Sequence, residues 1–135
     1  MRLEVTKKCD LAMEALHVLS KSEARIKGPQ LATEVGTTSG FLSQALTPLV
    51  RRGIVISDPG PTGGYSLGRG IDKISVLEII ESIEGPTVSG VCVLAEQPCN
   101  ENSHCALHHA WVKARTQLLK ELNKTSVAES LAGGS

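Results

Sequence analysis

The sequence predicts a mainly α-helical domain that carries one small β-hairpin. The chain has 135 residues but only one Phe, one Trp and one Tyr, so its core has to be built from aliphatic side chains, which favour packed helices. Apolar residues recur at three- and four-residue steps in several stretches, as on the buried faces of helices. One short β-branched run is followed by a turn rich in Gly and Pro, which indicates a single hairpin.

The first helix is predicted to begin after Thr6, a capping residue, and to end at about Ser20. Its apolar stripe predicts which side faces the core: Leu11, Ala12, Ala15, Leu16 and Leu19. His17 lies in the same helix, and we expect it to pack rather than to bind a ligand.

Residues 28–53 are typical of two helices joined by a tight turn. Pro29 suits the first position of a helix, Gly36 suits a left-handed cap, and Thr38 or Ser39 suits the start of the next helix. In a helix-turn-helix the second helix enters the DNA major groove and presents its first turns to the bases. The candidates for reading sequence are therefore Thr38, Ser39, Gly40, Ser43 and Gln44.

Pro48 interrupts this second helix. It removes the hydrogen bond to the carbonyl of Gln44, so we expect a kink or an early end of the helix. Arg51 and Arg52 follow, and we expect them to meet DNA phosphates or to form a solvated helix end.

A hairpin is predicted directly after the helix-turn-helix. Residues 54–57 and 65–67 have strand character, and residues 58–64 (DPGPTGG) have turn chemistry throughout. A hairpin at this place in the chain is a wing, although ordinary surface hairpins have the same pattern. As a wing it would place these residues against the sugar-phosphate backbone: Thr62, Gly63, Gly64 and Tyr65. Residues 1–86 are thus predicted to form a winged helix-turn-helix domain.

Three more helices are expected before the chain ends. Ser75 opens a short helix that closes at Gly85, and residues 106–123 form a helix of about 27 Å, with a last short helix after Ser126. The long helix carries an apolar stripe that a small domain does not cover: Leu107, Trp111, Ala114, Leu118 and Leu122. We therefore interpret residues 106–135 as a dimerisation helix and tail, and a homodimer would match a two-fold symmetric operator.

Three of the four cysteines fall close together, in the segment 87–105. Cys92, Cys99 and Cys105 are accompanied by His104 and His108, and such thiolates bind zinc or the irons of a cluster. Ligand type leaves both possibilities open, but the wide gaps between the cysteines favour iron and sulfur over a zinc knuckle. A metal-free thiol-disulfide switch and inert packing are the alternatives.

With these parts in this order, the chain resembles the iron-sulfur-dependent winged-helix repressors, and within them the NsrR and RirA branches more than IscR. The resemblance covers nearly the whole chain: the opening MRLEVTKKCDLAMEAL, the wing GPTGGYSLGR, the segment ISVLEIIESIEG, and ALHHAW after the cysteines. It implies that Cys92, Cys99 and Cys105 bind the cluster.

The resemblance leaves the fourth ligand open. Some branches use a histidine three residues after the third cysteine for a 2Fe-2S cluster, and His108 has that position. NsrR-like members use an aspartate from the first helix of the other subunit for a 4Fe-4S cluster, and Asp10 matches it. We favour Asp10 and 4Fe-4S, and Cys9 is a third and less suitable candidate.

Charge and composition narrow the function class. The formal net charge is zero, which argues against a protein that coats nucleic acid, but residues 1–52 hold eight basic and five acidic residues. The sequence has no apolar run of membrane-spanning length and no export signal, so we expect a cytoplasmic protein without a membrane partner. It offers no catalytic constellation, so neither an enzyme nor a small-molecule substrate is expected. The predicted function is a homodimeric repressor that binds double-stranded operator DNA and senses iron, nitric oxide or redox state.

Overall fold

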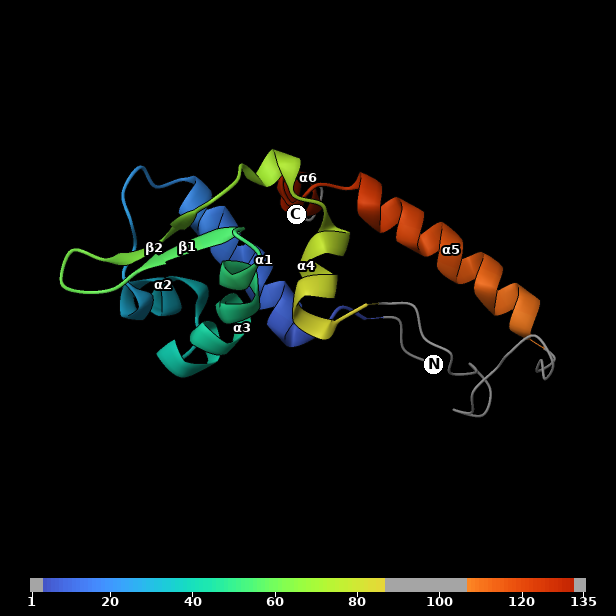
Figure 1. Ribbon diagram of the computed structural model, residues 1–135, viewed down its shortest axis with the longest axis horizontal. Coiled ribbons are helices and arrows are strands. Elements are labelled where there is room, and N and C mark those ends of the chain that lie inside the picture. The colour runs from blue at the N-terminus through green and yellow to red at the C-terminus, as the bar shows by residue number, and fades with distance from the viewer. Residues whose placement is uncertain (1–3, 87–106, 133–135) are drawn as a thin grey trace.

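The computed structural model describes residues 4–86 and 107–132 (Figure 1). It is a winged-helix fold, mostly helical with one two-stranded antiparallel sheet, as the sequence predicts. The elements are, in order, α1 (Lys7–Ser20), α2 (Gly28–Val35), α3 (Ser39–Arg51), β1 (Val55–Asp58), β2 (Gly64–Leu67), a 3-10 turn η1 (Ile71–Lys73), α4 (Val76–Glu84), α5 (His108–Lys124) and α6 (Val127–Ala132).

Side-chain caps fix where the helices begin. Thr6 Oγ1 accepts the N–H of Cys9 at 3.3 Å, and Ser75 Oγ accepts the N–H of Glu78 at 3.1 Å. At the start of α6 the cap is reciprocal, because Glu129 Oε1 also accepts the N–H of Ser126 at 3.3 Å. These local bonds explain why the predicted helix starts are confirmed.

The turn between α2 and α3 depends on glycine. Gly36 has a φ of 74°, in the left-handed region, and its N–H bonds the carbonyls that α2 leaves unpaired. Thr38 then caps α3, accepting the N–H of Phe41 at 3.2 Å. The helix-turn-helix is therefore closed by its own residues.

The expected early end of α3 at Pro48 is wrong, because the helix continues to Arg51. Leu46 and Leu49, on either side of the proline, are fully buried and hold this turn against the core. The carbonyl that loses its hydrogen bond belongs to Gln44, an exposed residue that water can reach.

A residue outside the two strands adds a further pairing to the sheet. β1 and β2 pair from Val55 with Leu67 to Asp58 with Gly64. β1 is shifted one residue later than the predicted strand 54–57, and β2 begins one residue before the predicted strand 65–67. Ile26, between α1 and α2, adds a third pairing through two hydrogen bonds with Tyr65, of 3.0 and 2.8 Å. The sequence did not predict this bridge, which fixes the wing relative to α2.

Aliphatic side chains from almost every element build one core. α1 contacts α2, α3, α4 and α6, so it is the central helix. The largest fully buried aliphatic side chains are Leu16, Leu31, Leu42, Leu46, Leu49, Ile54, Ile74, Ile79, Val55 and Val127.

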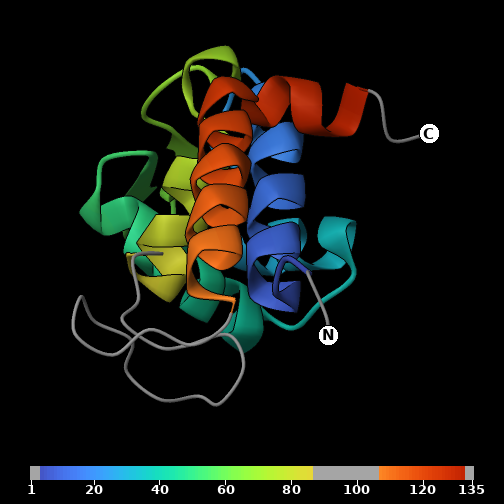
Figure 2. The same cartoon turned by 90° about the vertical axis from the view of Figure 1, so that its right-hand side faces the viewer.

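α5 has no buried residue among those that the structure describes, and it meets this core through Leu122, near its C-terminal end. It packs on α4 and extends from the α6 end of the molecule, opposite the wing (Figure 1). The start of α1 lies beside the end of α4, where Thr6 and Cys9 contact Glu84. Figure 2 shows the start of α5 low in the view, like these two, but Figure 1 shows it at the far tip of α5, away from both. The segment that carries the three clustered cysteines joins the end of α4 to the start of α5.

Candidate functional site

One face of α3 is polar and exposed. All the residues predicted to read DNA sequence from this helix are exposed to solvent: Thr38, Ser39, Gly40, Ser43 and Gln44. The opposite face is buried and anchors the helix through Leu42, Ala45, Leu46 and Leu49. The hydrophobic contacts therefore leave the polar face available to a partner.

Thr47 extends this face by one turn. It is exposed, lies three and four residues beyond Gln44 and Ser43, and its Oγ1 donates to the carbonyl of Ser43 at 2.7 Å. It was missed in the sequence because Pro48 suggested that the helix ends early. The helical spacing itself is the signal that identifies it.

Arg51 and Arg52 stand at the far end of α3. Both are exposed, and among the residues that the structure describes neither forms an ion pair. Their charges are thus available to an anionic partner, as a phosphate-binding role requires.

The wing turn has a structural requirement for its glycines. A Cβ added to Gly63 would lie 1.9 Å from the carbonyl oxygen of Asp58. Gly64 has a φ of +136°, and a Cβ there would lie 2.7 Å from the carbonyl oxygen of Ile26. These two glycines shape the turn, whatever they contact outside the protein.

Thr62 and Tyr65 differ in how far they are available. Thr62 is exposed near the tip of the turn, whereas Tyr65 is half-buried and its main chain is paired with Ile26. A Cβ added to Gly28 would be 3.6 Å from Tyr65 Cε2, so the ring lies close to the start of α2. Thr62 is the wing side chain best placed for a contact with DNA.

Of the residues predicted to bind a metal, three are described and three are not. Cys92, Cys99 and Cys105 lie outside the described residues. Within residues 4–86 and 107–132, no three His, Cys, Asp or Glu side chains come together as a metal site. A site built on the cysteine segment needs its remaining ligand from Asp10, His108 or Cys9.

Cys9 does not suit a metal in this arrangement. It is fully buried, and its Sγ donates to Glu84 Oε2 at 3.1 Å. Burial raises the pKa of the Cys9 thiol to about 11, and Glu84 acts in the same direction through its hydrogen bond and negative charge. Since the thiolate is the form that binds metal, a thiol held neutral here is a poor ligand.

Asp10 and His108 have more suitable positions. Asp10 is exposed in the first turn of α1. His108 is the first residue of α5 and half-exposed, and its ring stands edge-on to that of His109, with centroids 5.3 Å apart. α5 follows the cysteine segment in the chain, and the first turn of α1 contacts Glu84 at the end of α4, just before that segment.

His17 has a structural role, as predicted. Its Nε2 lies 2.8 Å from the carbonyl oxygen of Val127, and because a carbonyl accepts, this nitrogen carries the proton. The ring thereby joins α1 to α6.

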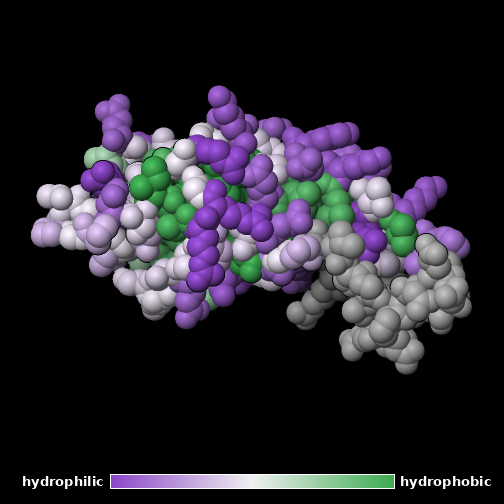
Figure 3. Space-filling view, in the orientation of Figure 1, coloured by the Kyte–Doolittle hydropathy of each residue, from purple (hydrophilic) through white to green (hydrophobic). Residues whose placement is uncertain are grey.

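Apolar side chains remain exposed on α5. In the part of the chain that the structure describes, none of the residues of α5 is buried, and Leu107 and Leu118 are each 45% exposed. Figure 3 shows apolar surface between charged side chains on the half of the molecule that carries α4 and α5. No helix in the described ranges combines the length and the apolar character needed to cross a membrane.

Comparison with known proteins gives a consistent picture. The family Rrf2, described as an iron-dependent transcriptional regulator, matches residues 5–132. An HTH-type transcriptional regulator of Aquifex aeolicus (strain VF5) is 30% identical over 121 residues, covering 87% of this chain and 84% of that protein. The HTH-type transcriptional regulator IscR of Xenorhabdus nematophila is 26% identical over 128 residues, covering 95% and 74%.

Solved structures share the whole fold. CymR, the global cysteine regulator of B. subtilis, superposes with a TM-score of 0.76 at 27% identity, covering 99% of both chains. IscR of T. potens superposes with a TM-score of 0.71 at 21% identity, covering 98% of this chain and 89% of that one.

Proposed function

Because the chain belongs to the Rrf2 family of DNA-binding transcriptional regulators, we propose that it is a cytoplasmic, homodimeric repressor that senses iron, nitric oxide or redox state through an iron-sulfur cluster. The family consists of transcriptional regulators, which are not enzymes. Support for the finer proposal comes from three parts of the molecule: the reading face, α5 and the cysteine segment.

The reading face is formed by α3 and the wing. α3 would lie in the major groove, with Ser43, Gln44 and Thr47 toward the bases, since these side chains are exposed and hydrogen-bonding. Thr62 on the wing, together with Arg51 and Arg52, would meet the sugar-phosphate backbone. Contacts of the first kind select a sequence, and contacts of the second kind supply affinity.

Dimerisation is assigned to α5. α5 packs on α4 and its Leu122 lies against the core, but none of its 17 described residues is buried, so much of its apolar surface remains to be covered. Pairing with α5 of a second subunit would cover Leu107 and Leu118, together with the half-buried Trp111 and Leu119. A two-fold axis between the helices would also present two copies of α3 to a symmetric operator.

The sensing site is assigned to Cys92, Cys99 and Cys105 with a fourth ligand from Asp10 of the partner subunit or from His108. Asp10 is exposed, as a ligand shared between subunits has to be, whereas Cys9 is buried and its thiol is neutral. When bound, the cluster supplies redox-active iron and a tie between the residues that ligate it. Loss of that tie would change the spacing of the two α3 helices, and a switch requires such a difference between states.

One placement supports the sensing proposal: α1, which holds Asp10, begins beside the end of α4, from which the chain continues into the cysteine segment (Figure 1). A ligand set drawn from these elements would couple the cysteine segment to the helix at the centre of the core. Any change at the ligands would then reach α2 and α3, which α1 contacts.

The test is to purify the protein without oxygen, record its absorption spectrum and assay iron and sulfide. A brown protein with about four irons per subunit supports Asp10 as ligand, and about two supports His108. A colourless protein that contains zinc would support a zinc-stabilised DNA-binding regulator instead. A colourless and metal-free protein that forms a reversible disulfide would support a thiol switch, and the likeness to CymR, a cysteine regulator, makes this outcome worth measuring.

A further inference from the structure

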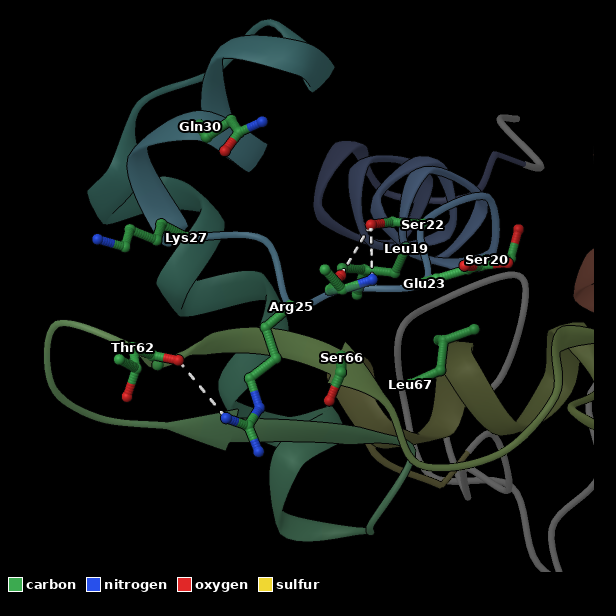
Figure 4. Close-up of a pocket in the computed structure, with 12 residues that line it drawn as sticks. Leu19, Ser20, Ser22, Glu23, Arg25, Lys27, Gln30, Thr62, Ser66 and Leu67 are labelled. Atoms are coloured by element: carbon green, nitrogen blue, oxygen red, sulfur yellow. Dashed lines mark hydrogen bonds between the residues drawn. The ribbon is translucent and has the colours of Figure 1, made fainter.

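Arg25 joins the loop before α2 to the wing. Its side chain crosses an open hollow of about 810 Å³ that is lined by the α1–α2 loop and β2 (Figure 4). Arg25 Nε lies 2.9 Å from Asp58 Oδ2, and Nη1 donates to the carbonyl oxygen of Thr62 at 3.5 Å. One side chain thus contacts both the end of β1 and the tip of the turn.

The main chain fixes Arg25 in this place. Ile26, the next residue, is paired with Tyr65 by two hydrogen bonds, and Gly64 approaches the carbonyl of Ile26 so closely that no Cβ fits. The last pair of the sheet is Asp58 with Gly64. Between these two residues, the main-chain hydrogen bond given by the structure runs from the N–H of Gly63 to the carbonyl of Gly60, at 3.0 Å. The Ile26–Tyr65 bridge thus fixes β2 relative to α2, and Arg25 adds side-chain contacts that reach beyond the bridge to the tip of the turn.

The charge of the wing makes this contact important for DNA. Residues 58–64 include one charged side chain, Asp58, and it is negative. Double-stranded DNA carries one negative charge per about 1.7 Å, and exposed charges separated by less than about 8 Å still interact appreciably at physiological salt. A wing with a lone carboxylate would be repelled from the backbone that it has to approach, and Arg25 cancels that charge.

We propose that Arg25 is a positioning residue of the DNA-binding surface, which neutralises Asp58 and holds the wing turn through Thr62 so that the wing lies against the phosphates. The inference rests on the reading face proposed above, but not on the nature of the sensing site. In the protein alone the pair contributes little to folding, because the side chains of Arg25 and Asp58 are 50% and 37% exposed. Its effect is therefore expected in DNA binding rather than in stability.

The test uses four variants of the full chain: Arg25→Gln, Asp58→Asn, the double variant of both, and Arg69→Gln. Arg69 is a matched control, because it forms an ion pair with Glu78 of similar exposure, 42% and 38%, outside the wing turn. Binding is measured by fluorescence anisotropy at several salt concentrations. The probe is a duplex of about 30 base pairs that the parent protein selects from a random-sequence library. Thermal unfolding of each variant verifies that it is folded.

Arg25→Gln is expected to bind about tenfold more weakly than the parent, and the double variant is expected to return to within about threefold, because it lacks the unpaired carboxylate. The double variant keeps the salt dependence of the parent, and Arg69→Gln binds as the parent does.

The proposal is overturned if the double variant remains as weak as Arg25→Gln and loses about one unit of salt slope, since Arg25 would then contact a phosphate itself. It is also overturned if Arg25→Gln binds normally or Arg69→Gln loses as much. Discrimination between sequences by Gln44→Ala tests the reading face separately, so failure of one idea does not imply failure of the other.

Discussion

Cys9 Sγ lies 3.1 Å from Glu84 Oε2, so the first turn of α1 is joined to the last residue of α4. Thr6 Oγ1, at 3.5 Å, makes a second contact with the same carboxylate oxygen. The cysteine segment follows two residues after Glu84, and Asp10 follows directly after Cys9. The contact therefore holds the last turn of α4 beside the first turn of α1, which carries the candidate ligand Asp10.

The Cys9 thiol is expected to make folding stability depend on pH in the alkaline range. Its pKa is raised from 9.0 to about 11 by burial, so the folded protein keeps a proton that the unfolded chain releases. The contribution is fully present below about pH 9 and is lost as pH rises through about 11, with an upper limit of about 3 kcal/mol. Urea unfolding under reducing conditions at about pH 8 and about pH 10.5 measures it, with Cys9→Ala as the control. An equal loss of stability in both proteins would contradict the assignment.

Two glycines are expected to respond in opposite ways to alanine. Gly64 has a positive φ and no room for a Cβ beside Ile26, so Gly64→Ala should lower the free energy of unfolding by about 2 kcal/mol or more. Gly40 lies in α3 with nothing within 4 Å of an added Cβ, so Gly40→Ala should raise it by about 0.5–1 kcal/mol. If Gly40 faces the bases, the stabilised variant nevertheless binds operator DNA more weakly. Thermal unfolding and DNA titration of the same two samples separate these effects.

Local chemistry explains which parts of the fold the sequence predicts. Thr6, Thr38, Ser75 and Ser126 each bond a main-chain N–H three residues away, so every one of these helix starts depends on a few adjacent residues. The left-handed turn at Gly36 is local in the same sense. Such features can be predicted before the tertiary structure is known.

Contacts between distant residues explain what the sequence does not predict. Ile26 pairs with Tyr65, and Arg25 reaches Asp58 and Thr62, but nothing in the composition of that loop distinguishes it from other polar loops. Of the two outcomes expected at Pro48, the early end of α3 failed for a related reason, because the buried Leu49 outweighs a hydrogen bond lost at the surface. The three cysteines are evident in the sequence, and their arrangement as ligands stays a prediction.

Gln44 and Arg52 are expected to differ in what they contribute to DNA binding. Gln44→Ala should reduce discrimination between the selected duplex and an unrelated one by about 1–3 kcal/mol, because an exposed amide on the reading face hydrogen-bonds base edges. Arg52→Gln should weaken binding to both duplexes equally and lower the salt slope by about one, as expected for a phosphate contact. Titrations of both duplexes at several salt concentrations measure both quantities. Equal losses of specificity in the two variants would refute the division of roles.

Leu118 is expected to stabilise the proposed dimer but to contribute little to the stability of the protomer. It is 45% exposed on α5, so Leu118→Lys should change the stability of the protomer by no more than about 0.5 kcal/mol. In a dimer the lysine would be buried between two helices, and the dissociation constant should rise about a hundredfold or more. Sedimentation velocity over a range of concentrations measures it. Thr116→Lys, at an exposed polar position of the same helix, is the matched control, and a similar effect in both variants would argue against the assigned face.

Asp10 and His108 are expected to have unequal effects on the proposed cluster. If the carboxylate of Asp10 is the fourth ligand, Asp10→Ala should lower iron content and alter the absorption spectrum, while His108→Ala retains both, because three thiolates alone leave an iron without its protein ligand. Neither change should affect the stability of the metal-free protomer much, since Asp10 is exposed and His108 is half-exposed. Iron, sulfide and absorption are measured on protein purified without oxygen, with Cys99→Ala as the variant that should lose the cluster and Cys9→Ala as the one that should keep it.

The reverse order, in which His108→Ala loses iron and Asp10→Ala does not, would assign a 2Fe-2S cluster to the histidine. If Cys9→Ala loses iron while both other variants keep it, the buried thiol has to leave Glu84 when metal binds, and the contact between α1 and α4 becomes the part of the structure that changes.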